Sequence, residues 1–333
     1  RLQAFQSHFE ADMVPLTAAF LQTLAVFCWW DRGTLNALIP HFMKLPYTSA
    51  YEILEGRLGP SARMTAAAIF IVTRLVWMSL LIYLAGKAMA VMMGWPRETI
   101  FYIIIVSGVI TVIYTTMGGL RGVVVTDTIQ FFILMLGPLL AIMAVTWKIG
   151  GVGAWFPTTW APHWDSEPFF SLDPHVRVTV VGSLVAYAAW WICTAGSDQM
   201  AIQRYFSTRN AACARRAFLI NSIAEISVAI LLSLTGFAML AYFTQYGSFG
   251  QGHSAISDAD YLFPHYIANY APVGIAGLIV AGMFSAAMSS LSSGVNSTVA
   301  VFTTDFIGRF TRAFDDDARR VRLTKILVLS IGL

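Results

Sequence analysis

Long apolar runs constrain this chain more than any other feature of its sequence. A helix needs about 20 apolar residues to cross the hydrocarbon core of a bilayer, and several runs of that length are separated by polar segments. We predict spans near residues 13–30 (with a bent continuation towards residue 43 as an alternative), 65–94, 99–117, 123–148, 177–202, 217–243 and 273–306, and an eighth that begins near residue 324. The sequence therefore predicts an all-α integral membrane protein, with residues 1–333 forming a single transmembrane domain.

The composition excludes an ordinary soluble domain. Of the 333 residues, 57% are hydrophobic and only 12% are charged, with a mean hydropathy of +0.66, whereas soluble domains have about 25% charged residues. The net charge of +3 is too small to indicate a nucleic-acid partner. The three cysteines have no metal-site or disulfide spacing. The chain opens with Arg1 and stops at Leu333 inside an apolar run, so we expect a fragment with no signal peptide.

Lysine and arginine are concentrated in alternate loops. These cations are Lys44, Arg57 and Arg63 before residue 65, Arg121 at 118–122, Arg204, Arg209, Arg215 and Arg216 at 203–216, and Arg309, Arg312, Arg319, Arg320, Arg322 and Lys325 after residue 306. The intervening segments 149–176 and 244–272 contain no Lys or Arg. Short cation-rich loops stay on the cytoplasmic side, so the pattern predicts the direction of every span. We expect a multi-pass protein of the cell membrane, in a bacterium the inner membrane.

Among the ionisable residues within the predicted spans, where burial of a charge is costly, three stand out: Asp127, Arg74 and Glu225. Asp127 stands near the cytoplasmic start of its helix, where the helix dipole alone also favours a carboxylate. Arg74 is interpreted either as a ligand residue or as a snorkelling side chain or structural ion pair. Glu225 lies about two turns into its span, which favours a functional role or an internal pair.

A polar stripe runs along the predicted helix at 273–306. Its members recur at steps of three or four residues, which places them on one helix face: Ser285, Ser289, Ser292, Ser293 and Asn296. Small hydroxyl residues also serve plain helix packing in membranes. Hydroxyl and carbonyl oxygens are hard ligands that suit an alkali cation better than zinc or copper.

The segment 189–199 combines a tryptophan pair with polar Thr194 and Ser197. Such a pair is either an interface anchor or part of a binding site. Signatures of catalysis are missing from the sequence, which has no HExxH, no Walker-type glycine loop followed by Lys and no GxSxG. We therefore do not expect an enzyme.

Three segments together resemble the hallmark motifs of the sodium:solute symporter family, whose members include sodium-coupled sugar, proline, pantothenate and sialic acid transporters. They are MGGLRGVVVTDTIQ at 117–130, SDQMAIQRYF at 197–206 and AAMSSLSSGVNSTVAVFTTD at 286–305. The segment YEILEGRLG at 51–59 is similar to the inner loop of the family. The resemblance runs from about residue 40 to the C-terminus.

The resemblance implies the five-plus-five inverted-repeat fold of leucine-type transporters, with solute and ions near the midplane at broken helices. The spans at 65–94, 99–117 and 123–148 resemble the third to fifth helices of the first repeat, and those that begin near 177, 217 and 273 resemble the first three of the second. The first broken helix is expected upstream of residue 1 and the final core helix beyond Leu333. The fold is therefore expected to be incomplete at both ends, and the fragment alone is not expected to transport.

The resemblance also implies two sites for sodium ions (Na+). The main site of the family is matched by Ala286 through its carbonyl and by the hydroxyls of Ser289 and Ser290. A second site nearer the cytoplasm is predicted from Asp127, Ser292 and Ser293, because a carboxylate opposite two hydroxyls forms a hard anionic pocket. In the alternative interpretation, Asp127 caps its helix and the serines only pack.

The solute positions depart from those of sugar transporters. Thr194 replaces the tyrosine that gates galactose, Trp191 replaces a neighbouring asparagine, and Glu225 replaces a sugar-binding lysine, so galactose is not expected. We expect Glu225 to face the solute cavity, where it either meets a cationic or hydroxylated substrate or balances Arg74. The predicted function is sodium-coupled secondary active symport that imports a small polar organic solute by alternating access. The alternative is a transporter-like membrane sensor fused to a signalling domain, which the sequence beyond Leu333 would distinguish.

Overall fold

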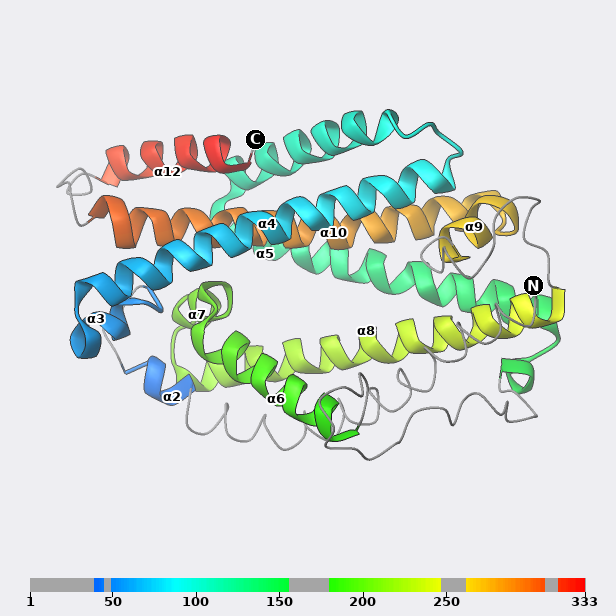
Figure 1. Ribbon diagram of the computed structural model, residues 1–333, viewed down its shortest axis with the longest axis horizontal. Helices are drawn as coiled ribbons and strands as arrows, with labels where there is room; N and C mark the ends of the chain where they lie inside the picture. The colour runs from blue at the N-terminus through cyan, green and yellow to red at the C-terminus, as the bar shows by residue number, and fades with distance from the viewer. Residues whose placement is uncertain (1–38, 45–48, 156–179, 247–261, 309–316, 333) are drawn as a thin grey trace.

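The computed structural model describes residues 39–44, 49–155, 180–246, 262–308 and 317–332, and these form helices without strands (Figure 1). In chain order the elements are α2 (Ile39–Phe42), α3 (Glu52–Leu58), α4 (Pro60–Met92), α5 (Thr99–Ile149), the 3-10 turn η2 (Val152–Trp155), α6 (Val180–Ser197), α7 (Gln199–Phe206), α8 (Ala211–Tyr246), α9 (Leu262–Asn269), α10 (Val273–Val301), the π-helical turn η5 (Phe302–Ile307) and α12 (Asp317–Gly332).

Four helical stretches are long and apolar enough to cross a membrane: Pro60–Met92, Thr99–Ile149, Ala211–Phe243 and Val273–Ile307. They contain the predicted spans at 99–117, 123–148, 217–243 and 273–306 and nearly all of that at 65–94. The predicted span at 13–30 lies outside the described residues. The predicted eighth span begins inside α12, seven residues after the helix itself starts at Asp317.

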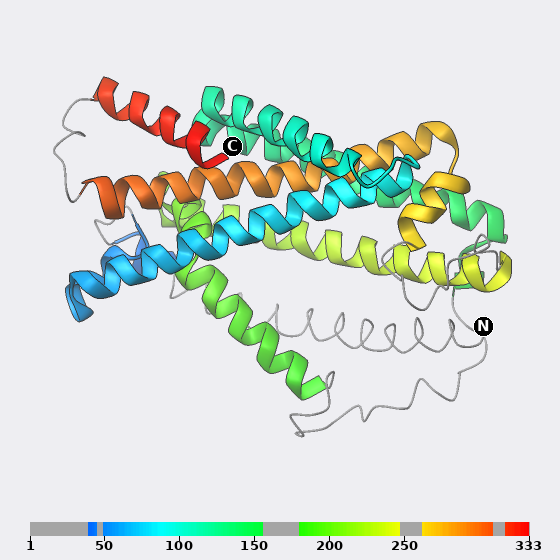
Figure 2. The same ribbon diagram turned by 45° about the horizontal axis from the view of Figure 1, so that its top comes forward.

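Helix α5 contains two predicted spans in one element. Gly119 interrupts it with φ 52° and ψ −154°, a conformation that is essentially restricted to glycine. The halves before and after Gly119 run in opposite directions along the molecule (Figures 1 and 2). The turn that the sequence predicts at 118–122 is therefore made by the backbone at one glycine.

The predicted span at 177–202 is broken at Asp198, which stands between α6 and α7 with an extended backbone (φ −78°, ψ 117°). The Asp198 side chain accepts a hydrogen bond from the Met200 N–H at 2.8 Å, and so caps the start of α7. Residues 177–179 lie outside the described part. A capped break of this kind lets α6 and α7 take different directions, as Figure 1 shows.

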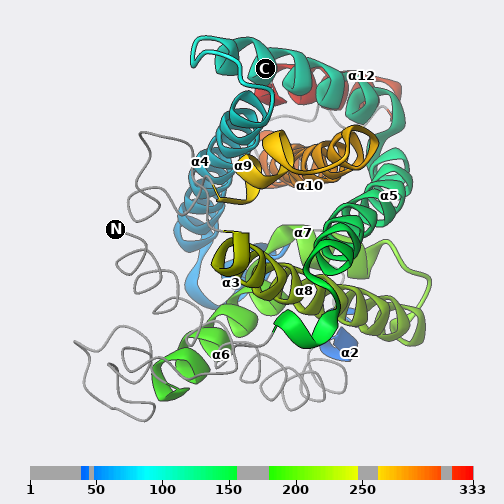
Figure 3. The same ribbon diagram turned by 90° about the vertical axis from the view of Figure 1, so that its right-hand side faces the viewer.

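Helix α10 lies between α4 and α5, with α12 beside it (Figure 3). Two glycines bring α10 and the second half of α5 close together. A Cβ atom on Gly137 would lie 3.2 Å from the Ile279 Cα, and one on Gly282 would lie 3.1 Å from the Ile133 carbonyl oxygen. Small residues permit such close helix contacts in membranes. The crossing places the polar stripe of α10 beside the start of the second half of α5.

Candidate functional site

The centre of the candidate site is the carboxylate of Asp127 on α5, which faces the serine stripe of α10. Its Oδ1 accepts hydrogen bonds from Ser289 at 2.8 Å and from Ser292 at 3.5 Å, and its Oδ2 accepts one from Ser293 at 2.8 Å. The Asp127 side chain is 16% exposed. The structure thus brings together the three residues predicted for a second sodium site, and it adds Ser289 to them.

A cation from a third helix completes this cluster. Arg204, in the last turn of α7, donates from Nη2 to Asp127 Oδ2 at 3.0 Å and to Ser293 Oγ at 3.1 Å. From the sequence we predicted Arg204 only as one of the cytoplasmic loop cations. No local signal in the QRYF segment identifies its partner, because Arg204 and Asp127 are 77 residues apart in sequence and lie on different helices.

The predicted main sodium site is only partly assembled by the contacts seen here. Ser289, which was assigned to it, donates its hydroxyl to Asp127. Ala286 and Ser290 are half-buried on the same stretch of α10. A sodium ion fits the oxygen donors of this stretch, since it prefers hard carboxylate, hydroxyl and carbonyl ligands. Among the described residues there is no cluster of three or more His, Cys, Asp or Glu side chains that suits a transition metal.

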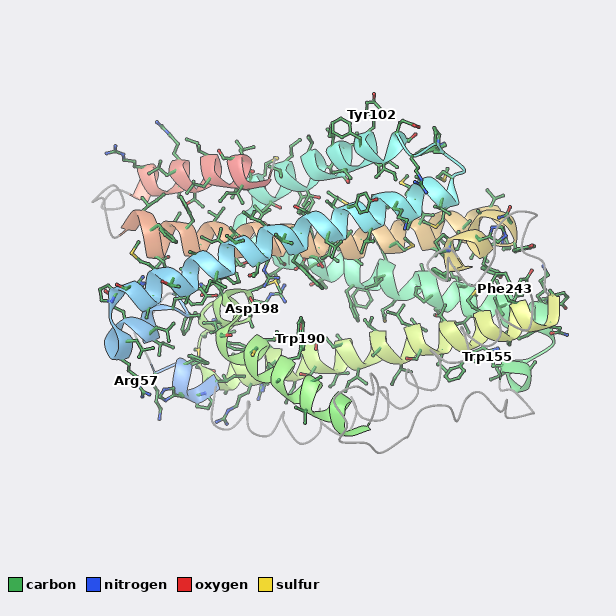
Figure 4. The ribbon with its side chains drawn as sticks, viewed as in Figure 1. Arg57, Tyr102, Trp155, Trp190, Asp198 and Phe243 are labelled. Atoms are coloured by element: carbon green, nitrogen blue, oxygen red, sulfur yellow. The ribbon has the colours of Figure 1, made fainter. Side chains whose placement is uncertain are left out.

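Arg74 and Asp198 form an ion pair between α4 and the α6–α7 junction. The Arg74 Nη2 lies 2.5 Å from the Asp198 Oδ2, and their side chains are 13% and 19% exposed. Asp198 is labelled at this junction in Figure 4. This geometry gives Arg74 the structural partner that one interpretation of the sequence required, and its charge is balanced without Glu225.

The other predicted solute residues lie on α6 and α8. The Thr194 hydroxyl donates to the Trp190 carbonyl one turn earlier at 2.7 Å, while the side chain of Trp191 lies outside the described part of the structure. Glu225 is exposed, lines an open pocket of about 380 Å³ between α5 and α8, and accepts a hydrogen bond from Asn221 at 2.8 Å. The remaining walls of that cavity are apolar: Phe131, Ala224, Val228, Ala229 and Leu232.

A second carboxylate inside the helix bundle, Asp305, was not predicted from the sequence. Asp305 in η5 is fully buried, and it accepts hydrogen bonds from Ser49 and from the Arg63 Nε, both at 2.6 Å. Arg63 also binds Glu55 at 2.7 Å and Glu52 at 3.4 Å. Because Asp305 stands at the end of a long apolar run, its sequence position resembles that of an ordinary interfacial residue. This network joins α3, α4 and η5.

Comparisons with known proteins point to one family. The model of the sodium:solute symporter family matches residues 16–333. The chain is 30% identical over 304 residues to the sodium/sialic acid symporter SiaT of Proteus mirabilis (strain HI4320), with 89% of this chain and 58% of that protein covered. It is 28% identical to the sodium-dependent multivitamin transporter of Oryctolagus cuniculus, with 92% of this chain and 48% of that protein covered.

The fold is similar to a solved structure of a Na+-coupled sialic acid symporter in a substrate-bound outward-open state. The TM-score is 0.82 at 24% sequence identity, and the match covers 99% of this chain and 71% of the other. The likeness supports the predicted leucine-transporter-type fold. The chain spans about half the length of the curated relatives that it matches.

Apolar helices long enough to cross a membrane, with a carboxylate and hydroxyl cluster where α5 meets α10, define the class, which is a multi-pass membrane protein. The match over residues 16–333 then identifies the group within that class. The chain belongs to the sodium:solute symporter family.

Proposed function

We propose that this protein is a sodium-coupled secondary active symporter that imports a small polar organic solute by alternating access, in a bacterium across the inner membrane. The observation that carries the proposal is the Asp127 carboxylate, which lies within hydrogen-bond distance of hydroxyls from three serines of α10. The similarity to sodium-coupled symporters supports it. A largely buried carboxylate with hydroxyl neighbours supplies the negative charge and hard oxygens that a monovalent cation needs to leave water.

Two sodium positions are part of this proposal. The main position uses the Ala286 carbonyl with Ser289 and Ser290, and the second uses Asp127 with Ser292 and Ser293. Ser289 stands between them, because it is assigned to the first and donates to the carboxylate of the second at 2.8 Å. The occupancy of both ion positions would therefore depend on the orientation of the Ser289 hydroxyl.

The solute is proposed to bind near Trp191, Thr194, Glu225 and Arg74. The support for Glu225 is its place in the cavity between α5 and α8, with Asn221 as a polar neighbour. A carboxylate and an amide on an otherwise apolar wall suit a solute with a cationic or hydroxylated group. Arg74 would reach the solute when its ion pair with Asp198 opens. The distance between these two side chains depends on the position of α4 relative to α6.

Uptake into proteoliposomes by the full-length protein tests the proposal. The solute panel should contain sialic acids, vitamins, monocarboxylates, sugars and organic cations, each with an inward sodium gradient and with a potassium gradient as the control. We expect sodium-dependent uptake of one class, and a sodium Hill coefficient above one that falls towards one in Asp127→Asn. The exposed Glu98 provides a matched control, and Glu98→Gln should leave the coefficient unchanged.

Absence of sodium-dependent uptake throughout the panel would contradict symport. A coefficient near one in the wild type, unmoved by Asp127→Asn, would reject the second ion position. For the solute position, Glu225→Gln should change the half-saturating concentration of the transported solute, and an unaltered value would exclude Glu225 from the cavity role.

A further inference from the structure

Arg204 occupies part of the space that the second sodium position requires. Its Nη2 atom lies 3.0 Å from Asp127 Oδ2 and 3.1 Å from Ser293 Oγ, which are oxygens of two of the three residues assigned to that position. We propose that the Arg204 guanidinium is an internal competitor for sodium: it neutralises Asp127 when no ion is bound, and it must withdraw before an ion binds. This inference rests on the proposed sodium-coupled function.

Electrostatics makes the two cations mutually exclusive at this place. A sodium ion that used Asp127 Oδ2 and Ser293 Oγ would stand within a few ångströms of the guanidinium, and two cations at that distance repel each other strongly where water is scarce. The single carboxylate also carries only one negative charge, so it compensates one cation fully and two only in part. Binding of the ion therefore requires Arg204 to move away.

The exposure of the partners indicates which one moves. The Arg204 side chain is 40% exposed, whereas that of Asp127 is 16% exposed and is held by hydroxyls from Ser289, Ser292 and Ser293. A long side chain with access to solvent loses little when its charged end returns to water. The carboxylate therefore stays in place for the ion, and the arginine is the group that swings out.

The position of Arg204 is linked to other elements through the short helix α7. At its start, Asp198 binds Arg74 of α4, and the Gln199 side chain accepts a hydrogen bond from the Ala50 N–H at 2.8 Å. One turn before its end, Gln203 accepts a hydrogen bond from Asn296 of α10 at 3.4 Å. A shift in the position of α7 would therefore accompany release of the Arg204 side chain. Ion binding would in this way alter the contacts of α7 with α4 and α10.

A charge-removing substitution tests the competition directly. Sodium binding to the purified full-length protein is measured by titration calorimetry without solute, for the wild type, Arg204→Gln and Arg209→Gln. Arg209 is an exposed arginine of the following loop and provides the matched loss of charge. We expect the half-saturating sodium concentration to fall about tenfold in Arg204→Gln, within the usual range of coupling between two ligands, and to stay at the wild-type value in Arg209→Gln. An unchanged or raised value in Arg204→Gln would overturn the inference.

Arg204→Lys separates charge from packing. Because the ammonium keeps the positive charge, its half-saturating sodium concentration should stay near that of the wild type. If Arg204→Lys binds sodium as tightly as Arg204→Gln, the competition is not electrostatic and the inference fails. If wild type and Arg209→Gln bind no sodium at all, it is the proposed function that fails, and the two failures are thus distinguishable.

A labelling measurement needs no variant and so does not depend on mutant folding. Phenylglyoxal, which modifies exposed guanidinium groups, is applied to the wild type in sodium chloride or in choline chloride, and modified arginines are quantified by peptide mass spectrometry. Sodium should increase labelling of Arg204 and leave that of Arg209 constant. Labelling of Arg204 that is unchanged or reduced by sodium would contradict withdrawal of the side chain.

Discussion

Two carboxylates inside the helix bundle have similar partners but different surroundings. Asp127 and Asp305 each bind one arginine and at least one serine hydroxyl. The arginine at Asp305 is only 14% exposed and is also held by Glu55 and Glu52, whereas Arg204 at Asp127 is 40% exposed. Because a guanidinium enclosed by three carboxylates has no easy route to water, the Asp305 pair is expected to be permanent and the Asp127 pair exchangeable.

Asp305→Asn tests the structural role of the enclosed pair. Arg63 keeps Glu55 and Glu52 in this variant, but the hydrogen bonds of Ser49 and Arg63 to the fully buried carboxylate are weakened, and we expect the free energy of unfolding to fall by about 1–3 kcal/mol. The measurement is the midpoint of thermal unfolding of the full-length protein in detergent, with the exposed Glu98→Gln as the control. Equal midpoints for the two variants would show that Asp305 is not needed for stability.

At the scale of single helices, glycine residues determine the reversal of α5 and its close contact with α10. Gly119 lets α5 reverse its direction through a backbone with positive φ. Gly137 and Gly282 allow α5 and α10 to approach each other until the backbones are nearly in contact. The first feature depends on φ and ψ alone, while the second depends on the lack of a side chain, so substitutions at these positions are expected to act by different mechanisms.

Substitution of Gly119 by alanine isolates the backbone effect. A Cβ atom at Gly119 or at Gly118 would meet nothing within 4 Å, yet of these two glycines only Gly119 has a positive φ. We expect Gly119→Ala to destabilise the protein by about 1–3 kcal/mol, the usual cost of a strained backbone position, and Gly118→Ala to have little effect. Thermal unfolding in detergent compares the two, and indistinguishable midpoints would refute the backbone explanation of the turn.

Close packing of α5 against α10 is tested by Gly282→Ala. The added methyl group would stand 3.1 Å from the Ile133 carbonyl oxygen, and the helices must separate to admit it. Overpacking of this kind costs about 1–3 kcal/mol. A methyl group on Gly277 of the same helix would meet no atom within 4 Å, so Gly277→Ala should be neutral. Because the crossing also positions Asp127 against the serines, Gly282→Ala should in addition weaken sodium binding, and unaffected binding would separate the crossing from the ion site.

At the scale of the whole molecule, the two ends of the bundle are held by different chemistry. The end with α3 and α7 (Figure 1) contains the ion pairs of Arg63, Arg74 and Arg204. At the opposite end, which carries α9, the Lys148 ammonium donates to the Tyr242 hydroxyl at 2.8 Å and lies over the rings of Tyr242, Tyr246 and Tyr270. The membrane orientation predicted from the loop cations places the end with the ion pairs on the cytoplasmic side and the end with the tyrosines on the opposite side.

Lys148→Met is expected to loosen the outer end alone. The substitution keeps an apolar stem but removes the cation from the tyrosine rings, an interaction of about 0.5–2 kcal/mol. Burial, with Tyr242 as its neighbour, raises the pKa of Tyr266 to about 12, so the Tyr266 hydroxyl in this ring cluster stays neutral even at a pH near the ordinary tyrosine pKa of about 10. Hydrogen exchange should become faster in α9 and stay unchanged in α3 and α7. Faster hydrogen exchange at both ends of the bundle, or at neither, would show that the two ends are not stabilised independently.

The membrane location, the positions of most spans and the serine stripe of α10 can all be predicted from the sequence. These features follow from hydropathy, charge and helical periodicity, which are local properties and add up along the chain. The resemblance to family motifs also indicated Asp127 and the serines as partners, and the structure places them within hydrogen-bond distance.

Which charges meet is settled only when the helices pack. Asp305 joins Arg63 across 242 residues of sequence, Arg74 joins Asp198 across 124, and Arg204 joins Asp127 across 77. No local pattern specifies these pairs, because each depends on where two helices cross and on the direction that a break at Gly119 or Asp198 gives to the chain. A buried charge requires a partner of opposite sign, but the helix packing chooses that partner.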